Sequence, residues 1–451
     1  MYRVLIANRG EIALRIMRTL REFGHETVAI YSTADQESLH VQFADHAVCI
    51  GGPQLSESYL NIQNILNAAE AYNVDFIHPG YGLLSENPHF VKKIEKLGLG
   101  FVGPSSDVLF RAGNKLKMKT IAKSLEISTL PFSTHNQESL NQIKSEAETI
   151  GFPVLLKATN GGGGKGIRIA ENPSDIDSAY DTIVNEIEVN FGDGEIYIEK
   201  FLKKAKHIEV QAAMDYDGNF FHFGERECTI QRNNQKIIEE SLPALSKSFP
   251  IEAMRHATKK LFETLKYTGI GTVEFLIDNE NNYYFLEINP RLQVEHPVTE
   301  MLTGIDIVKL QLDIESRKTS DYFQNQLVFN GHAIECRILV KPPHTNKFTG
   351  LIKNLSLPGG PDVRIDTHIY SGYHVPPFYD PLLGKLIVKA KTRPQAIKKM
   401  LVALEQFIID GIDTNIEELY QILHDQSFID GTYQTALLQG QLNLSGVIYH
   451  E

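Results

Sequence analysis

The sequence predicts an α/β protein, α+β in part, that is divided into two or three domains. Its 451 residues are too many for one compact core. The chain opens with a strand at residues 3–8, a helix at 11–23 and a strand at 27–31, which together make a β-α-β unit. The pattern changes to a long helix at 115–125, and a third region of strands follows residue 311. We therefore expect an α/β domain first and mixed regions after it.

The composition is typical of a globular enzyme, with 42% hydrophobic and 22% charged residues. The 44 Lys and Arg residues against 56 Asp and Glu residues give a net charge of −12, which argues against nucleic acid or a membrane surface as a general partner. Cys49, Cys228 and Cys336 are far apart, so we predict neither a disulfide framework nor a zinc site. No apolar run is long enough to span a membrane and no signal peptide opens the chain, so we expect a soluble cytoplasmic protein.

The first β-α-β unit lacks the glycine fingerprint of a dinucleotide site, because its turn contains only Gly10. The α/β pattern continues through residues 75–82 to 101–104. The loop at 78–82, His-Pro-Gly-Tyr-Gly, follows a strand, and α/β folds place ligands at such positions. Taken alone, this loop is more typical of a structural turn than of a site.

A run of four glycines at residues 161–164 lies between strands expected at 153–158 and 167–170. A P-loop would need glycine at position 159 and serine or threonine after the lysine, but this chain has Thr159 and Gly166 there. The spacing of a dinucleotide fingerprint does occur, but a strand follows it where a helix is required. Neither standard phosphate motif therefore explains this run.

A glycine loop between two strands forms a flap whose bare N–H groups can close over phosphates. Lys157 precedes this flap and Lys165 lies within it, and both would neutralise phosphate charge. A helix expected at 137–150 leads into the first of the two strands. We favour phosphate binding over a plain flexible linker.

The segment after the flap contains polar residues whose environment the sequence leaves open. Residues 195–202 form a strand that ends in a linker, where main-chain groups can bind an adenine edge. Residues 207–211 alternate polar and apolar, which fits either a solvated sheet face or one wall of a site. Residues 225–236 would be an exposed polar loop between two strands, and 250–265 predicts an amphipathic helix.

A hairpin at residues 271–289 carries the strongest chemical signal. Its two strands are joined by turn residues at 278–282, and folding it about that turn brings Glu274 opposite Glu287. Two facing carboxylates repel, so this arrangement needs a cation. With Asn289 on the same face as Glu287 and Phe285, the oxygen ligands favour Mg²⁺ or Mn²⁺. A solvated hairpin edge is the alternative.

Charged and polar residues continue beyond the hairpin at alternate positions. Arg291, Gln293 and Glu295 are expected to point one way, and Pro290 and Pro297 stiffen the segment. Arginine suits an oxyanion and a neighbouring carboxylate can act as a base. Packing alone does not explain such alternation, so we predict a site here.

The third region is predicted to contain strands at 332–338 and 386–390 and a helix at 393–409, with turns at 358–361 and 376–381. No internal repeat and no low-complexity tract is present in the sequence.

Four motifs together closely resemble those of biotin carboxylase, the ATP-grasp component of biotin-dependent carboxylases such as acetyl-CoA carboxylase. They are Asn8-Arg-Gly-Glu-Ile-Ala, the segment from His78 to Asn87, Lys157 with the glycine flap, and Arg291-Leu-Gln-Val-Glu-His-Pro-Val-Thr-Glu-Met301. The resemblance runs from end to end. It implies an N-terminal Rossmann-like α/β domain at 1–112, an ATP-grasp domain at 113–330 with a glycine-rich lid at about 131–202, and a C-terminal mixed domain at 331–446.

The resemblance also implies a role for each matching residue. ATP would be held by Lys115, Lys157, Gly162, Gly163, Gly164, Lys165, Gly166, Glu199, Lys200, Leu202, His207, Gln231, Asn234, Glu274 and Glu287. Two Mg²⁺ (or Mn²⁺) ions would be held by Glu274, Glu287 and Asn289. Bicarbonate would be held by Lys236, Arg291, Gln293, the main chain of Val294 and Glu295, which would be its base. Biotin would lie at Arg337 and Tyr81, with Asp380 in support.

The resemblance implies that bicarbonate attacks ATP to form carboxyphosphate, which then carboxylates biotin. The chain has no Ala-Met-Lys-Met motif, so we expect biotin on a separate carrier protein and the acyl acceptor on carboxyltransferase subunits. A homodimer is also expected. Two departures from the family pattern are Asn234, where the family usually has histidine, and residues 338–342. The alternatives are a carbamoyl-phosphate-forming ATP-grasp enzyme and a catalytically silent ATP-binding protein.

Overall fold

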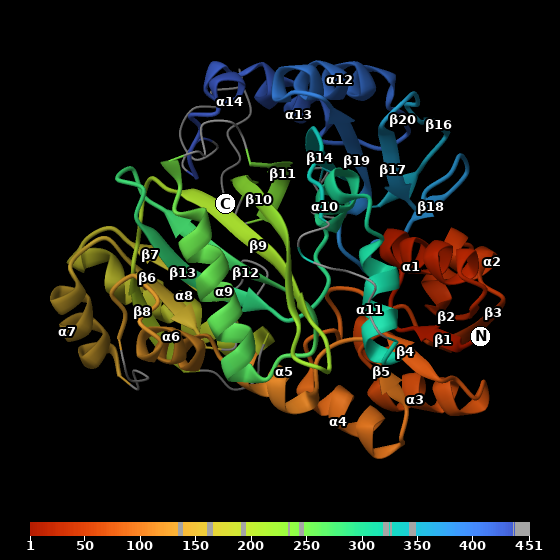
Figure 1. Cartoon of the computed structure of the whole chain (residues 1–451), viewed down its shortest axis with the longest axis horizontal. Helices are drawn as coiled ribbons and strands as arrows, with labels where there is room; N and C mark the ends of the chain where they lie inside the picture. Colours follow the sequence, from red (N-terminus) through yellow and green to blue (C-terminus); the bar gives the residue numbers. More distant parts are fainter. Residues whose placement is uncertain are drawn as a thin grey trace.

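The computed structural model of the chain describes residues 1–133, 139–159, 166–190, 195–232, 235–242, 248–318, 324, 327–341, 349–435 and 437, with the backbone alone at 188–190. Figure 1 shows the N-terminal α/β unit beside a large central sheet, with the C-terminal helices above that sheet. None of the described helices is long and apolar enough to cross a membrane.

The N-terminal unit is built on a five-stranded parallel sheet with strand order β3-β2-β1-β4-β5. Its strands are β1 (Arg3–Ile6), β2 (Glu26–Ser32), β3 (His46–Gly51), β4 (Phe76–His78) and β5 (Gly100–Phe101). Its helices are α1 (Gly10–Glu22), α2 (Leu39–Phe43), α3 (Ile62–Ala71), α4 (Pro88–Lys96) and the short 3-10 turns at Thr33–Asp35 and Leu55–Glu57. The predicted β-α-β opening is confirmed.

Alternate residues of β1, and Ala7 directly after it, pack on opposite faces of this parallel sheet. Val4 and Ile6 pack with apolar residues of α1, whereas Leu5 and Ala7 pack with those of α3 and α4. The strand is therefore buried on both faces, as parallel strands covered by helices usually are. This explains why its sequence is almost continuously apolar.

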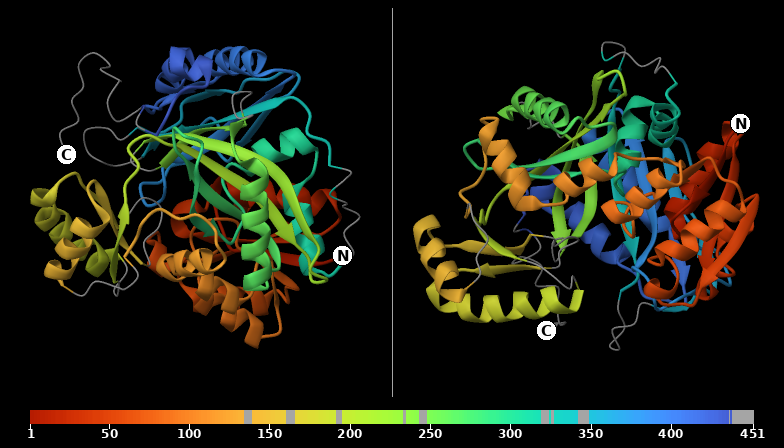
Figure 2. Two further views of the ribbon diagram at one scale, coloured as in Figure 1. Left: turned by 60° about the vertical axis from the view of Figure 1, so that its left-hand side comes forward. Right: turned by 90° about the horizontal axis from the view of Figure 1, so that it is seen from below.

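A second, three-stranded sheet forms the lid region. Its order is β7-β6-β8, with β6 (Val154–Ala158), β7 (Ile167–Ala170) and β8 (Ile196–Lys200), all antiparallel. The helices α7 (Leu140–Ile150) and α8 (Ile176–Asn190) pack on it, after a 3-10 turn at Pro173–Asp175, and α5 (Ser106–Ala112) and α6 (Lys115–Ser124) precede it. Figure 2 shows this small sheet with its helices projecting to one side of the molecule. The predicted strands on either side of the glycine run are confirmed.

The central sheet has eight antiparallel strands in the order β13-β12-β9-β10-β11-β14-β19-β17. The strands are β9 (Lys206–Met214), β10 (Phe220–Arg232), β11 (Gln235–Ser241), β12 (Gly269–Ile277), β13 (Tyr283–Asn289), β14 (His332–Leu339), β17 (Val363–Thr367) and β19 (Leu382–Ala390). Helices α9 (Ile251–Leu265) and α12 (Arg393–Gln406) bury their apolar sides against one face of this sheet. The opposite face meets α10 (His296–Thr303), and α11 (Ile307–Glu315) packs on α1.

The remaining elements complete the C-terminal region. They are α13 (Ile416–His424), α14 (Gln426–Asp430) and two small sheets, β15 (Gly350–Leu351) with β18 (His374–Val375) and β16 (Asn354–Ser356) with β20 (Ile408–Asp410). The central sheet continues across residue 330, because β11 pairs with β14. The proposed C-terminal region therefore shares its sheet with the preceding one.

The hairpin of β12 and β13 differs from the predicted alternation in one respect. The predicted register is confirmed, since Glu274 pairs with Glu287. However, the register shifts between Glu274 and Phe275, and this bulge leaves Phe285 in the core with Ile288. The expectation that Phe285 and Glu287 share a face was wrong, because a bulge reverses the facing of the residues that follow it.

Three other local predictions were also wrong. Residues 225–232 and 235–236 belong to strands β10 and β11, and Arg226 and Glu227 are buried, so this segment is no exposed loop. The last predicted helix ends at Gln406, and the residues after it form strand β20. Residues 291–295 are irregular, so their side chains converge without strand geometry. In each case tertiary contacts decided a segment whose local pattern was ambiguous.

Glu240 connects three elements at the top of the central sheet. Its carboxylate accepts hydrogen bonds from His332 Nε2 at 2.7 Å, from Arg393 Nε at 2.8 Å and from the Tyr433 hydroxyl at 2.5 Å. Burial alone would raise the pKa of Glu240, but His332 and Arg393 lower it from 4.5 to about 2. The ionised carboxylate therefore stabilises the junction of β11, β14 and α12.

We expect Glu240→Gln to lower the free energy of unfolding by roughly 3 kcal/mol at pH 7, because the folded state favours the ionised carboxylate. A carboxyl whose folded pKa is lowered stabilises the protein fully above its unfolded pKa, and this contribution disappears as the pH falls from 4.5 to about 2. Urea denaturation at several pH values measures the difference. Glu70→Gln, on an exposed position of α3, is the matched control, and a pH-independent difference would contradict the prediction.

Candidate active site

One large cavity, of about 1680 Å³, is bordered by the N-terminal unit, the lid sheet and the central sheet. Its lining includes the predicted residues Tyr81, Lys115, Lys157, Glu199, Lys200, Leu202, His207, Gln231, Lys236, Glu274, Glu287, Asn289, Arg291, Gln293, Val294, Glu295, Arg337 and Asp380. Gly166 does not line it, and its N–H donates to Glu186 at 3.1 Å. Gly162, Gly163, Gly164, Lys165 and Asn234 lie outside the described residues.

The Lys236 ammonium, which extends from β11, joins three carboxylates at the centre of the cavity. Its Nζ donates to Glu209 at 2.7 Å, to Glu274 at 2.8 Å and to Glu295 at 2.7 Å. Burial would lower the Lys236 pKa, but these carboxylates raise it well above its ordinary value. Burial would likewise raise the pKa of Glu295, but Lys236 and Arg337 lower it far below its ordinary value. Lys236 and Glu295 are therefore both charged at neutral pH.

Arg226 on β10 lies next to the Lys236 ion pairs and has no exposed surface. Its guanidinium donates to Glu209 at 2.6 Å, to Gln211 at 2.8 Å and to Gln293 Oε1 at 2.8 Å. The amide of Gln293 is thereby oriented, and its Nε2 donates to Glu274 at 3.0 Å. Residues 207–211 are thus one wall of the site rather than a solvated face.

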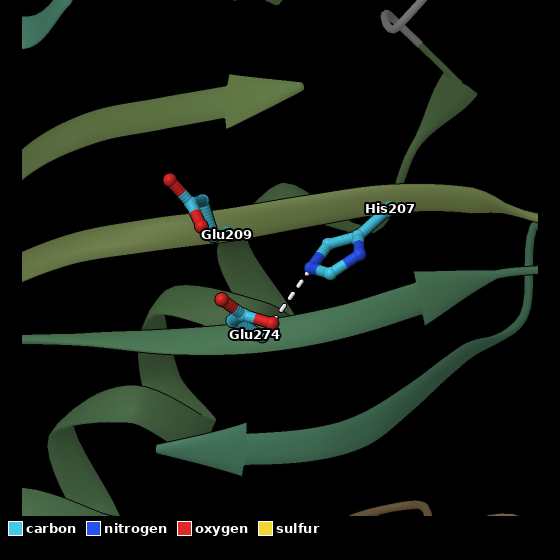
Figure 3. A group of neighbouring side chains, drawn as sticks. All are labelled: His207, Glu209 and Glu274. Carbon is cyan, nitrogen blue, oxygen red and sulfur yellow. Dashed lines mark ion pairs between the residues drawn. The ribbon is translucent and has the colours of Figure 1, made fainter. Parts of the chain in front are cut away.

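His207, Glu209 and Glu274 form a compact group on adjacent strands of the central sheet, as Figure 3 shows. One ligand atom from each lies within 4.8 Å of the others. His207 Nε2 is 2.8 Å from Glu274, and its Nδ1 pairs with Gln231 at 2.8 Å. The Lys236 ammonium bridges the carboxylates of Glu209 and Glu274, so a lysine side chain supplies the positive charge next to this group.

Glu287 faces Glu274 across the hairpin and is held differently. Lys115 Nζ, at the start of α6, lies 2.7 Å from Glu287 Oε2. Asn289 Nδ2 donates to Glu274 at 2.9 Å, and Asn289 Oδ1 accepts from Arg291 at 3.1 Å. Two carboxylates and an amide oxygen are hard donors of the kind that Mg²⁺ prefers, so these three residues fit a magnesium site.

Glu199 lies at the lid end of the cavity and is held by two lysines. Lys119 on α6 and Lys157 on β6 both donate to its carboxylate, the second at 2.7 Å. Burial would raise the Glu199 pKa, but the two lysines lower it. Lys119 is fully buried and was absent from the predicted set. Its ammonium joins α6 to the lid sheet.

Arg337 on β14 lies at the opposite end of the ionic group. Its Nε donates to Glu239 at 2.6 Å and its Nη2 to Glu295 at 3.1 Å. Burial raises the pKa of Glu239 to about 7, although Arg337 lowers it in part. The Tyr81 hydroxyl donates to Glu11 rather than to Arg337, Glu239 or Glu295. Arg291 pairs with Glu86, five residues after Tyr81.

Comparison with known proteins gives a consistent result over the whole length. Residues 1–109 match the family model described as biotin carboxylase, N-terminal domain, and residues 335–440 match its C-terminal domain. Between them, residues 114–320 match the ATP-binding domain of the carbamoyl-phosphate synthase L chain.

The chain belongs to the biotin carboxylase family.

Relatives in this family align with almost the entire chain. Biotin carboxylase 1 of Bacillus subtilis is 44% identical over 441 residues, which are 97% of this chain and 98% of that protein. The biotin carboxylase of a Nostoc species is 43% identical over 97% of this chain and 98% of its own length. Membership of this family makes the chain an ATP-dependent ligase.

Solved structures agree with this assignment. A Campylobacter jejuni biotin carboxylase complex superposes with a TM-score of 0.93 at 41% identity, covering 97% of this chain and 98% of that one. The biotin carboxylase domain of the Hydrogenobacter thermophilus 2-oxoglutarate carboxylase gives 0.93 at 40% identity, covering 97% of each chain. The mixed α/β architecture with an ATP-grasp core is therefore established.

Several residues of this biotin carboxylase site were missed by sequence reasoning. They are Glu11, Glu86, Lys119, Glu209, Arg226 and Glu239. The alternation at 207–211 placed Glu209 on the same face as His207, and Glu11 and Glu86 lie within two of the quoted motifs, although no role was assigned to them. The others are joined to the site by contacts between residues far apart in the chain.

We expect Lys119→Met to lower the free energy of unfolding by about 3 kcal/mol, because it leaves the buried Glu199 with one cation in place of two. Urea denaturation measures this loss. Lys123→Met, an exposed position on the same helix, is the matched control and should change stability by less than about 0.5 kcal/mol. Equal effects of the two substitutions would contradict the structural role of Lys119.

Proposed function

We propose that this chain catalyses the ATP- and bicarbonate-dependent carboxylation of biotin carried on a separate carrier protein. The observation that carries the proposal is the meeting of Lys236 with Glu274 and Glu295 in one cavity. This cation joins Glu274, one of the two carboxylates suited to magnesium, to Glu295, the carboxylate suited to act as a base. The family models and relatives named above support the same reaction.

ATP would occupy the side of the cavity between the lid sheet and the hairpin. Lys115 and Lys157 would neutralise phosphate charge, together with the glycine flap, whose residues 162–165 are proposed by resemblance alone. Glu199, Lys200, Leu202, His207 and Gln231 would surround the base, and Asn234 stays a prediction. Closure of the flap would keep water from a reactive intermediate. The C. jejuni relative is described as a biotin carboxylase–β,γ-ATP complex.

Magnesium would be held by Glu274, Glu287 and Asn289, whose oxygen atoms fit it. When bound, the metal supplies charge that neutralises the transferred phosphoryl group. Lys115 and Lys236 hold the two carboxylates ionised in its absence, so no proton has to leave them when it binds. The H. thermophilus domain is described in complex with MgADP and bicarbonate.

Bicarbonate would lie against Arg291, Lys236, Gln293 and the main chain of Val294. Glu295 would remove its proton, while Arg291 and Lys236 stabilise the growing negative charge. The oxygen of the deprotonated bicarbonate attacks the γ-phosphorus, the bond to ADP breaks, and carboxyphosphate and ADP form. Arg226 orients Gln293 for this step through the contact at 2.8 Å.

Carboxyphosphate would then release carbon dioxide and phosphate, and the phosphate would take the ureido proton of biotin. Arg337 would stabilise the enolate-like oxygen of biotin, with Tyr81 and Asp380 in support. The bond of Arg337 to Glu295 at 3.1 Å supports placing biotin beside the bicarbonate position. The departure at 338–342 affects the residues that follow Arg337, of which 342 lies outside the described part.

The role in a larger assembly is also a proposal. We infer a biotin carboxyl carrier protein, carboxyltransferase subunits, a cytoplasmic location and the first half-reaction of acetyl-CoA carboxylase in fatty acid synthesis. Relatives that serve 2-oxoglutarate carboxylase and pyruvate carboxylase leave other acceptors open. A homodimer, as in the H. thermophilus domain dimer, should have twice the chain mass of 50.8 kDa in light scattering. The domain limits 1–112, 113–330 and 331–446 remain part of the proposal.

The test is release of ADP from Mg-ATP, with and without bicarbonate and with and without free biotin. We expect turnover that requires bicarbonate and rises with biotin. Turnover that requires bicarbonate but responds to ammonia in place of biotin would favour a carbamoyl-phosphate-forming enzyme, to which the middle family model also relates. ATP binding without any turnover would instead support a silent binding protein.

We expect Glu295→Gln to abolish bicarbonate-dependent ADP release, because the amide cannot accept the proton of bicarbonate. The Kd for ATP should change by no more than about twofold. Lys236 still pairs with Glu209 and Glu274, and Arg337 still pairs with Glu239. Calorimetric titration with ATP measures the second quantity. Glu252→Gln, 85% exposed on α9, is the matched control. Unchanged turnover would remove Glu295 from the role of base.

A further inference from the structure

Two main-chain carbonyls behind the loop at 291–295 are held by buried side chains. The carbonyl oxygen of Gln293 accepts a hydrogen bond from His296 Nδ1 at 2.7 Å. The carbonyl oxygen of Val294 accepts one from Lys385 Nζ at 2.9 Å. Both Lys385 and His296 have no exposed surface. The loop is therefore fixed at two successive peptide groups.

Fixing these carbonyls also fixes two N–H groups. The carbonyl and the N–H of one trans peptide point in opposite directions. The N–H of Val294 shares a peptide with the Gln293 carbonyl, and the N–H of Glu295 shares one with the Val294 carbonyl. No described residue accepts a hydrogen bond from either N–H. Both residues line the cavity at the start of α10, so two free donors are presented together where anions bind well.

Lys385 is held in this position by charge. Its Nζ lies 3.3 Å from Glu11 Oε2 on α1 and 4.0 Å from Asp366 Oδ2 on β17. It extends from β19, where it pairs in register with Arg337 of β14. One ammonium thus contacts the N-terminal unit, the loop and the C-terminal strands.

His296 acts as a neutral donor. Its surroundings contain the cations Lys385, Arg15 and Arg364, and Glu300 lies 3.9 Å from its Nε2. Burial and these cations lower its pKa well below the ordinary value. A carbonyl can only accept, so the single ring proton must be on Nδ1. The neutral ring therefore donates from Nδ1 to the Gln293 carbonyl.

We propose that Lys385 and His296 are positioning residues for bicarbonate, because they hold the two carbonyls so that the N–H groups of Val294 and Glu295 face the anion. The inference rests on the proposed function of this loop. Neither side chain touches the reacting atoms. Donors that are oriented before the substrate arrives stabilise developing charge without reorganisation, and loss of one such donor costs on the order of 100-fold in rate. A shift of the loop by about 1 Å would have a similar effect.

The first experiment compares Lys385→Met with Lys389→Met, the same change four residues along β19. The variant should still fold, because Asp366 retains its ion pair with Arg364 and Glu11 retains its hydrogen bond from the Tyr81 hydroxyl. We expect Lys385→Met to raise the KM for bicarbonate at least about tenfold and to lower kcat, with the Kd for Mg-ATP within about twofold. The control should leave all three unchanged. Lys385→Arg, which retains a donor, should restore part of the loss.

The second experiment remains decisive if Lys385→Met fails to fold. His296→Ala removes the donor to Gln293, whereas His296→Asn places an amide N–H near the position of Nδ1. We expect the alanine variant to raise the KM for bicarbonate about tenfold and the asparagine variant to recover most of this loss. Failure of asparagine to differ from alanine would overturn the role of His296.

The outcomes separate this inference from the function on which it rests. Bicarbonate-dependent ADP release by the wild-type protein, with an unchanged KM for bicarbonate in Lys385→Met, would overturn the inference alone. Parallel changes in the KM for bicarbonate and the Kd for ATP, with a lower Tm, would indicate a purely structural role and also overturn it. A wild-type protein without bicarbonate-dependent turnover would overturn both.

Discussion

The rest of the site depends on the ion pairs that the Lys236 ammonium makes with three carboxylates. The ammonium neutralises Glu209, Glu274 and Glu295 within hydrogen-bonding distance, in a region where isolated charges would cost several kcal/mol each. Without that cation, burial of Glu274 and Glu295 would be less compensated, and the pKa of each carboxyl would rise. Two further cations pair with the same carboxylates: Arg226 contacts Glu209, and Arg337 contacts Glu295.

The fold itself distributes these groups over distant segments. Lys236, Glu274 and Arg337 extend from one antiparallel sheet, whereas Lys157 and Glu199 extend from the separate lid sheet. The cavity lies between these two sheets and is lined by residues of both. Lys119 joins helix α6 to Glu199 of the lid sheet.

Periodic patterns in the sequence predicted much of this arrangement. The turn at 278–282 and the period of two residues along a strand were enough to place Glu274 opposite Glu287. The bulge beside that pair was not predictable, because an extra residue in one strand leaves no mark in local alternation. Lys119 and Arg226 were missed for another reason. Their partners Glu199 and Gln293 lie 80 and 67 residues away, and only the folded chain brings them together.

The continuous central sheet determines which kinds of side chain can serve this site. Strands β11 and β12 are separated by β9 and β10, so their backbones lie roughly 14 Å apart along the sheet at about 4.8 Å per strand. Lys236 and Glu274 nevertheless meet at 2.8 Å. The side chains of Lys236 and Glu274 together close this gap. The length of these side chains is therefore as important as their charge. A residue of the same charge with a shorter side chain would not reach its partner.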